Sequence, residues 1–478
     1  MLHVFGEPHY GFFRDELYFI ACGRHPAWGY VDQPPMVPLL AAFSQLFGHS
    51  LVALRAVSSF FAAASAFVAC KIALELEGKE FAQALAGVAV MLGTASVALS
   101  TDSPGMWLWP LAVLYVLRIV KGGSPKLWLG AGAALGLCAE AKYSVAFFAV
   151  ALIVGLIDTP GRRPLRTPWF FGGVCVAVLL AAPSIIWQWG HGFPMIELLR
   201  NGAAGKNVVL SPIEFMLRQF WINNPILSLL WIAGLVYVFR TRVHRWLAVT
   251  YVVLITIMIV LHAKDYYPAA IYIALFGAGG VAIESLTAGR RAIRATIVAA
   301  AILAGLILLP PSLPVLSEQQ YIAYAQALRL QPPAEENKAM GALPQEYADM
   351  HGWPELAAAV GRVYDDLPPI ERSKAAVYTS NYGEAAALDF FGSQYGLPPA
   401  LSGHNEYFLW GPRGFDGSIV LRVGGDAAVL RRVFGDVRLV AEFHNPLGMP
   451  YEDNLPIFLC RHIATPLPVL WPVVKHFD

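Results

Sequence analysis

Long apolar runs alternate with short polar connectors through the first 310 residues of the chain. A helix that crosses a bilayer needs about 20 apolar residues, within a range of about 17–25. Some runs reach this length, and the shorter ones must extend into flanking residues or tilt beside neighbouring helices. The pattern predicts a polytopic α-helical membrane protein with about ten spans, at residues 51–72, 82–100, 105–120, 127–139, 144–157, 169–189, 222–239, 246–261, 267–283 and 295–309.

The connectors differ in charge, which predicts how the spans are oriented. Lys and Arg are in excess in the cytoplasmic connectors of membrane proteins. Connectors rich in these residues alternate with connectors that carry acidic or mixed groups, so both ends of the chain are expected outside. An outer N-terminus is awkward to insert, and we therefore expect a further helix upstream of Met1. The expected inner connectors are 71–80, 118–126, 160–166, 240–245 and 289–294, and the outer ones are 101–105, 139–144, 190–221 and 262–268.

The pattern changes from about Pro310. Charges become frequent, Pro and Gly interrupt the chain, and no further run of span length appears. The stretch "LRVGGDAAVLRRVFGDVRLVAEFHNP" alternates in the way of a strand, a helix and a strand. We therefore expect a transmembrane domain at 1–310, whose outer loop 1–50 carries an acidic motif, and a soluble α/β domain outside the membrane at 311–478.

Composition supports this division and excludes some functions. Hydrophobic residues make up 57% of the 478 residues and charged ones 14%, whereas soluble domains are about 25% charged. The net charge of +1 gives no electrostatic case for nucleic acid as a partner. The five cysteines show no metal-like spacing, and three lie in apolar runs, where a cysteine is usually a small buried hydrophobe. We expect no disulfide framework.

The acidic clusters all fall at the outer rims of the spans, where ionisable residues are costly to place and often functional. "FFRDELYFIACGRHPAWGYVDQPP" carries the adjacent carboxylates Asp15 and Glu16. Neighbouring residues of a helix point about 100° apart, so one carboxylate can act as a general base while the other positions a neighbour or a metal. Acidic residues at the start of a solvated helix are an equal alternative. Arg14, Arg24 and His25 are candidates for contacts with phosphate or sugar.

Two further outer connectors carry candidates. Asp102 in "STDSPGMWLW" suits a functional site as well as an ordinary helix N-cap. Lys142 and Lys264 are cations on the acidic side, where they suit the phosphate of a lipid or act as helix-end lysines that snorkel. In "HAKDYYPAAIYIA", His262 and Tyr267 accompany Lys264 before a proline that opens a span.

The outer domain adds the polar–aromatic segments "NYGEAAALDFFG" and "SGHNEYFLWGP". Their residues Glu384 and His404 suit sugar hydroxyls and faces, although the core of a surface domain produces similar segments. Asp32, just before two prolines, fits a turn. The chain has no Walker loop, dinucleotide fingerprint, HExxH or nucleophile elbow, so no cofactor is expected with certainty, and the participation of a divalent metal ion stays open.

Together these segments resemble bacterial family-39 glycosyltransferases, which are related to protein O-mannosyltransferases and aminoarabinose transferases. The resemblance rests on "RDELYFIACGRHPAWGYVDQPPMVPLLAAFSQLFG", "TDSPGMWLW", "AEAKYS", "KDYYPAAIYIA" and the two outer-domain segments, and spans nearly the whole chain. It implies a GT-C fold in the bacterial plasma membrane, with the active site and the C-terminal domain on the outer side. It also implies a polyprenyl-phosphate sugar donor among the membrane lipids, and transfer with inversion to a glycan, lipid or protein acceptor.

The resemblance implies roles for single residues. Asp15 is expected to be the catalytic base, with Glu16 beside it, and Asp102 resembles a second acidic motif. Lys142 and Lys264 resemble contacts with the donor phosphate. We therefore expect a hexosyl- or pentosyltransferase.

Two other functions were weighed against this one. A transporter or flippase of a lipid-linked sugar is the main alternative, but transporters favour ionisable groups at mid-membrane, whereas these lie at one rim. A non-catalytic scaffold with a sugar-binding outer domain would leave the acidic loop unexplained.

Overall fold

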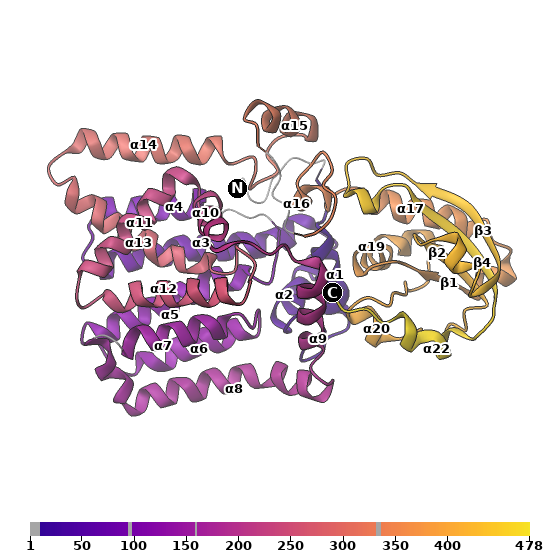
Figure 1. Ribbon diagram of the computed structural model, residues 1–478, viewed down its shortest axis with the longest axis horizontal. Coiled ribbons are helices and arrows are strands. Elements are labelled where there is room, and N and C mark those ends of the chain that lie inside the picture. The colour runs from indigo at the N-terminus through magenta and orange to yellow at the C-terminus, as the bar shows by residue number, and fades with distance from the viewer. Residues whose placement is uncertain (1–9, 94–97, 158–159, 331–335) are drawn as a thin grey trace.

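The computed structural model describes residues 10–93, 98–157, 160–330 and 336–478. A bundle of helices lies at one end of the molecule and a domain with a small sheet at the other, with a layer of short helices between them (Figure 1). That intermediate layer contains α1 (Arg14–Arg24), α2 (Met36–Gln45) and α9 (Pro194–Asn201).

Each of the ten predicted apolar runs contains a helix of the bundle. These helices are α3 (Leu51–Glu75), α4 (Glu80–Gly93), α5 (Ser103–Val120), α6 (Leu127–Ala139), α7 (Val145–Ile157), α8 (Pro168–Gly190), α11 (Pro225–Arg240), α12 (Arg245–Val260), α13 (Ala269–Leu286) and α14 (Arg291–Ile307). Within the described residues, four of them, α3, α5, α8 and α13, are long and apolar enough to cross a membrane. A fifth span can form from α10 (Pro212–Ile222) and α11, which are bent by 108°. The others are shorter, as the shorter runs predict.

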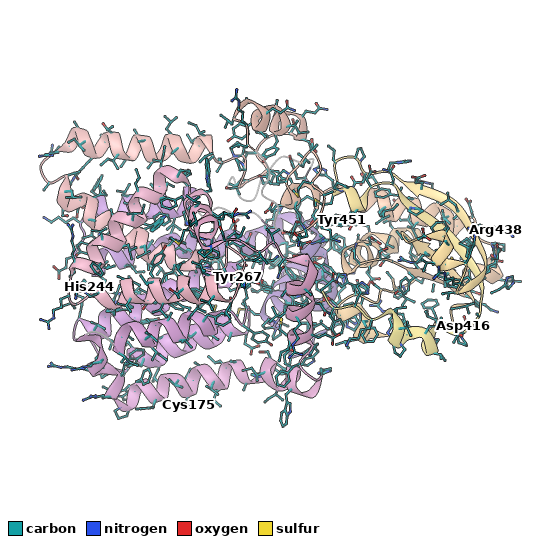
Figure 2. All side chains as sticks on the ribbon, viewed as in Figure 1. Cys175, His244, Tyr267, Asp416, Arg438 and Tyr451 are labelled. Atoms are coloured by element: carbon teal, nitrogen blue, oxygen red, sulfur yellow. The ribbon has the colours of Figure 1, made fainter. Side chains whose placement is uncertain are left out.

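Inner and outer connectors lie at opposite ends of this bundle. His244, in a connector predicted inside, lies at the end far from the sheet (Figure 2). Tyr267, in a connector predicted outside, lies at the end next to the intermediate layer (Figure 2). This arrangement agrees with the alternation of charge along the sequence, and the side that faces the cytoplasm stays a prediction.

Small residues let the bundle helices approach closely. A Cβ atom on Gly132 of α6 would lie 2.0 Å from the carbonyl oxygen of Gly173 in α8. One on Gly234 of α11 would lie 2.1 Å from the carbonyl oxygen of Leu275 in α13. Close packing of this kind holds helices together in lipid, where the hydrophobic effect does little to associate them.

The outer domain is built on a four-stranded sheet with the order β1-β2-β4-β3. Strands β1 (Ala375–Tyr378) and β2 (Ile419–Val423) are parallel, and β4 (Leu455–Ile463) is antiparallel to both β2 and β3 (Phe434–Phe443). The short helix α21 (Ala427–Leu430) joins β2 to β3. The predicted strand–helix–strand segment is therefore confirmed.

Shorter elements complete the chain. They are η1 (Pro160–Arg166), η2 (Gly202–Lys206), α15 (Glu318–Ala327), α16 (Gln345–Ala348), α17 (Trp353–Asp365), α18 (Pro369–Arg372), α19 (Tyr382–Phe391), η3 (Gly392–Tyr395), α20 (Glu406–Trp410), η4 (Pro450–Glu452), α22 (Leu467–Leu470) and η5 (Trp471–Val474).

One hydrophobic core joins the intermediate layer to the outer domain. It contains Leu17 and Tyr18 of α1, Val37 of α2 and Leu388 of α19, each at most 2% exposed. Most residues of α1 are buried. The acidic segment at the start of the chain is therefore enclosed between the bundle and the outer domain.

Candidate active site

Asp15 lies in the first turn of α1 and faces the outer domain. Its Oδ1 accepts a hydrogen bond of 2.8 Å from the hydroxyl of Tyr382, the first residue of α19. The same Oδ1 lies 3.6 Å from Nε of Arg14. The Asp15 side chain is 34% exposed, so solvent or a substrate can still reach its carboxylate.

Arg14 supplies the positive charge next to this carboxylate. Its Nη1 donates to the hydroxyl of Tyr451 at 2.7 Å and lies 3.6 Å from Oδ2 of Asp349. The guanidinium also stands 5.4 Å from the centre of the Tyr382 ring. Because the Arg14 side chain is only 11% exposed, its charge acts on Asp15 with little screening by water.

Glu16 points into the protein, away from solvent. Its Oε2 accepts the backbone N–H of Phe13 at 2.9 Å, and its Oε1 accepts that of Leu99 at 3.0 Å. Burial raises the pKa of Glu16, and the charge of Arg55 opposes this shift. Since Leu99 belongs to the connector that leads to Asp102, Glu16 ties the two acidic segments together. Glu16 therefore holds the start of α1 in place, and its predicted part in catalysis stays a prediction.

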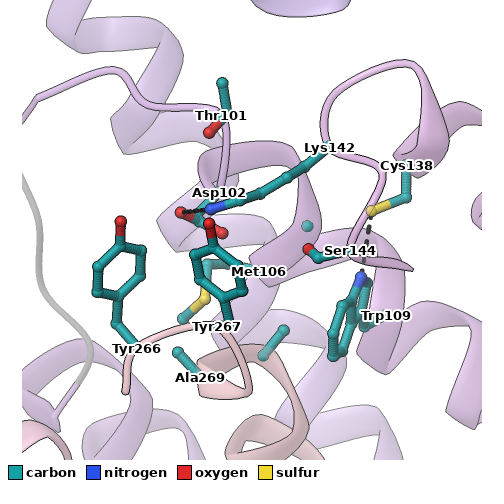
Figure 3. Close-up of a pocket in the computed structure, with 12 residues that line it drawn as sticks. Thr101, Asp102, Met106, Trp109, Cys138, Lys142, Ser144, Tyr266, Tyr267 and Ala269 are labelled. Carbon is teal, nitrogen blue, oxygen red and sulfur yellow. Dashed lines mark hydrogen bonds and ion pairs between the residues drawn. The ribbon is translucent and has the colours of Figure 1, made fainter. Parts of the chain in front are cut away.

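Asp102 and Lys142 form an ion pair at the outer end of the bundle. Asp102 occupies the N-cap position of α5, but its side chain makes no capping hydrogen bond. Its Oδ2 instead lies 2.7 Å from Nζ of Lys142 (Figure 3). The ammonium group also stands 4.1 Å from the ring centre of Tyr267 and 5.1 Å from that of Tyr266. The Asp102 side chain therefore does not act as an ordinary helix N-cap.

This ion pair lines a small pocket between α5, the connector after α6, and the start of α13 (Figure 3). Although burial acts to lower it, the pKa of Lys142 is raised, because the Asp102 carboxylate favours the charged ammonium. A cation held in place over aromatic rings and beside one carboxylate suits the binding of an anionic group such as a phosphate.

The connector before α13 brings a second ion pair to the same end of the bundle. Nη1 of Arg218, in α10, lies 3.1 Å from Oδ2 of Asp265, and the amide of Gln219 donates to the Asp265 carbonyl oxygen at 2.8 Å. Lys264 is half-buried, 5.7 Å from the Tyr266 ring centre. His262 is exposed, with a left-handed φ of 50°. The sequence did not predict Arg218, because it lies in a long connector with no recognisable motif.

Arg24 and His25 lie at the other end of α1 from Asp15. Nine residues of α-helix separate Arg24 from Asp15, a rise of about 14 Å. Arg24 donates to the carbonyl oxygen of Asp389 at 3.2 Å, and the His25 ring lies 4.6 Å from the ring of Trp410. The structure therefore does not bring these two predicted residues to Asp15.

Asp32 connects the first outer loop to the outer domain. The hydroxyl of Tyr18 donates to Oδ1 of Asp32 at 2.9 Å and accepts the backbone N–H of Glu406 at 3.2 Å. Burial raises the pKa of Asp32 to about 6, and that of Glu406 to about 8. The charge of Asp15 adds to the shift at Asp32, so the two carboxylates act on each other.

Glu384 is buried inside the outer domain. Its carboxylate accepts the backbone N–H of Ser380 and the side-chain amide of Asn381, each at 2.9 Å. The same amide donates to Glu452 at 2.8 Å. Burial raises the pKa of Glu384 to about 7. With 1% exposure, Glu384 has no surface to offer a sugar in this conformation.

His404, His476 and Asp478 are the one group of side chains in the described parts of the chain that could hold a metal ion, with ligand atoms within 4.8 Å of one another. The backbone N–H of Tyr382 faces Nδ1 of His404 at 3.4 Å, so the ring proton belongs on Nε2. Nε2 in turn lies 2.9 Å from Oδ1 of Asp478. Ligation of a metal through Nε2 would need the other tautomer, so these contacts favour a hydrogen-bonded pair over a metal site.

Comparisons with known proteins agree with this architecture. Residues 32–187 match the family model described as dolichyl-phosphate-mannose-protein mannosyltransferase. The matched segment includes Asp32, Asp102 and Lys142, whereas Asp15 and the outer domain lie beyond it. No curated protein sequence matches the chain significantly.

Two solved structures share the fold over nearly the whole chain. Both are of ArnT from Cupriavidus metallidurans, one bound to undecaprenyl phosphate and one in the apo state. The first has a TM-score of 0.60 and 14% identity and covers 95% of this chain and 94% of its own. The second has a TM-score of 0.58 and 13% identity and covers 94% and 93%. The predicted fold, a membrane helix bundle with a C-terminal α/β domain, is confirmed by this likeness.

Proposed function

We propose that the chain is a family-39-like membrane glycosyltransferase with the GT-C fold, and that it moves a sugar from a polyprenyl-phosphate-linked donor to an acceptor hydroxyl, with inversion, at the outer face of a bacterial plasma membrane. The observation that carries this proposal is the accessible carboxylate of Asp15. It lies on α1, in the layer between the bundle and the outer domain (Figure 1), and the neighbouring Glu16 is hydrogen-bonded to Leu99 in the connector that leads to Asp102. The ArnT structure with undecaprenyl phosphate supports a donor of this lipid class.

A single displacement accounts for the reaction. The Asp15 carboxylate takes the proton of the acceptor hydroxyl as its oxygen attacks the anomeric carbon. The bond between that carbon and the phosphate oxygen breaks, and its electron pair leaves with the polyprenyl phosphate. Because attack comes from the face opposite the leaving group, one step inverts the configuration, unlike the two steps of a retaining enzyme.

Lys142 is the group we assign to the leaving phosphate. Its ammonium is held by Asp102 and by the rings of Tyr266 and Tyr267, so it needs little reorganisation to meet a developing negative charge. Arg218 lies at the same end of the bundle and can supply a second cation.

The hydrogen bonds of Glu16 support this arrangement. By accepting the backbone N–H groups of both Phe13 and Leu99, the Glu16 carboxylate fixes the start of α1 against the connector that carries Asp102. Asp15 and the Asp102–Lys142 pair are thereby held at fixed positions relative to each other.

The test uses the full chain, reconstituted in vesicles with a panel of polyprenyl-phosphate sugars and with lipid, glycan and protein acceptors. We expect one donor to support transfer and Asp15→Asn to lower the rate about 10³-fold or more, as the loss of a catalytic group does. Asp365→Asn is the control, since the Asp365 side chain is 63% exposed at the end of α17. Transfer at the normal rate by Asp15→Asn would remove Asp15 from the mechanism, and a retained anomeric configuration in the product would exclude the single displacement.

A further inference from the structure

We infer that Tyr382 of the outer domain is a positioning residue for the base, holding Oδ1 of Asp15 so that Oδ2 is the oxygen that receives the acceptor proton. This inference rests on the proposed function, because it takes Asp15 as the base. It goes beyond that function by assigning a part of the site to the outer domain and by separating the roles of the two carboxylate oxygens.

The contacts of Asp15 are unequal between its two oxygens. Oδ1 accepts the Tyr382 hydroxyl at 2.8 Å and lies 3.6 Å from Nε of Arg14. Among the described residues, the hydrogen bond to Asp15 falls on Oδ1, and the ion-pair contact with Arg14 is also to Oδ1. Since the side chain is 34% exposed, Oδ2 is the oxygen left for an acceptor hydroxyl.

The ring of Tyr382 is held on several sides. Its centre lies 4.5 Å from that of Tyr18 and 4.8 Å from that of His404, and the Arg14 guanidinium stands 5.4 Å from it. Tyr382 is 8% exposed. A buried ring with neighbours on these sides cannot swing away, so its hydroxyl stays at one position relative to Asp15.

The backbone of Tyr382 is fixed as well. It is the first residue of α19, and the preceding Asn381 caps this helix by accepting the backbone N–H of Glu384 at 2.9 Å. The backbone N–H of Tyr382 itself faces Nδ1 of His404 at 3.4 Å. The outer domain therefore presents the hydroxyl from a rigid helix start.

The hydroxyl remains a donor across the working range of pH. Burial raises the pKa of Tyr382 well above that of free tyrosine, so the O–H is not lost. A hydrogen bond from a neutral hydroxyl to a carboxylate is short and directional. It fixes the rotation of the carboxylate, and a base misplaced by about 1 Å loses about 100-fold in rate.

The chain offers a matched control in a second buried tyrosine–aspartate pair. The hydroxyl of Tyr407 donates to Oδ2 of Asp389 at 2.9 Å, also in the outer domain. Asp389 accepts the backbone N–H of Ala400 and pairs with Arg413 as well, and it plays no part in the proposed reaction. Tyr407→Phe therefore removes the same atom and the same kind of bond away from the site.

The experiment compares Tyr382→Phe, Tyr407→Phe and Asp15→Asn in the reconstituted full chain, with the sugar donor that the panel identifies. We expect Tyr382→Phe to lower kcat about 10- to 100-fold, with KM within about twofold and binding of undecaprenyl phosphate alone unchanged. Arg14, Asp32 and Asp349 also act on the Asp15 carboxylate and are the same in both tyrosine variants.

The outcomes separate the two proposals. If Asp15→Asn is inactive while Tyr382→Phe and Tyr407→Phe have the same kcat and KM, the inference fails and the proposed function stands. If Asp15→Asn transfers normally, or if the wild-type chain transfers no sugar of the panel, the proposed function fails and the inference fails with it. Equal melting temperatures of the two tyrosine variants would show that a lower kcat of Tyr382→Phe does not come from unfolding.

Discussion

Nζ of Lys142 lies 2.7 Å from Oδ2 of Asp102, so one ion pair joins the connector before α5 to the connector after α6. The two side chains are 19% and 32% exposed, which leaves the pair reachable from the pocket. An incoming phosphate would share the ammonium with Asp102 and would not find it free. Asp102 thus sets the position of the cation and weakens its hold on the anion.

Replacement of Lys142 tests its assignment to the phosphate. We expect Lys142→Met, which keeps the apolar stem and removes the charge, to lower kcat/KM about 10²- to 10³-fold, as the loss of one preorganised donor does. Lys374→Met is the comparison, because Lys374 is exposed in the outer domain and has no part in the proposed reaction. An equal loss in both variants would contradict a special role for Lys142. A binding assay with undecaprenyl phosphate alone shows whether the loss lies in affinity or in chemistry.

The positioning role of Glu16 predicts a loss of stability. In Glu16→Gln, the amide group faces a backbone N–H of Phe13 or Leu99, so one donor loses its acceptor. We expect a cost of about 1–3 kcal/mol in the free energy of unfolding and a lower kcat, measured by thermal melting and by transfer.

The control for Glu16 is another capping-box glutamate. Glu214 accepts the backbone N–H of Ser211 at 2.9 Å, but in an exposed position. Glu214→Gln should change the melting temperature much less, because water replaces the lost partner. Equal effects of the two changes would mean that the buried bond to Leu99 contributes nothing.

The pair of Glu384 and Glu452 predicts that stability falls as pH rises. Burial raises the pKa of Glu384 from 4.5 to about 7 and also raises that of Glu452, so the folded protein binds these protons more tightly than the unfolded chain. The free energy of unfolding therefore decreases as pH rises from about 4.5 through about 7, where Glu384 loses its proton. Melting of the solubilised protein should show a smaller decrease in Glu384→Gln than in wild type. Glu355→Gln, at an exposed position of α17, should keep the wild-type slope.

The hydrogen bonds of His404 predict that the outer domain does not need a metal ion bound to His404, His476 and Asp478 in order to fold. We expect a chelator to leave the melting temperature unchanged, and Zn²⁺ to give no stabilisation. Isothermal titration of the full chain with Zn²⁺, with His476→Ala as the control, measures this directly. Tight binding of Zn²⁺ that is lost in His476→Ala would show that His404, His476 and Asp478 form a metal site.

The helix bundle could be predicted from the sequence because the length and composition of an apolar run are local properties. The same holds for the segment around β2, α21 and β3, where the hydrophobic period changes within a few residues. The lengths of the spans could be predicted less well from the sequence, since tilt and packing against neighbours decide where a helix such as α7 ends.

The candidate site could be predicted only in part. Asp15, Asp102 and Lys142 could be singled out from the sequence because charges at the rim of a span stand out against their apolar surroundings. Tyr382 was not, since its partner Asp15 is 367 residues away and only the folded chain brings them together. Arg24 and His25 lie at the opposite end of α1 from Asp15, and their role as contacts with phosphate or sugar stays a prediction.

The burial of α1 between the bundle and the outer domain has a consequence for the order of biosynthesis. Asp15 and Arg14 are made first, but their partners Tyr382 and Tyr451 are made only near the end of translation. Until those residues have been made and folded, the side of α1 that packs against the outer domain remains uncovered and the Asp15 carboxylate lacks the hydroxyl of Tyr382. A chain whose bundle is complete but whose outer domain is not therefore lacks the surroundings of Asp15 that the folded protein has.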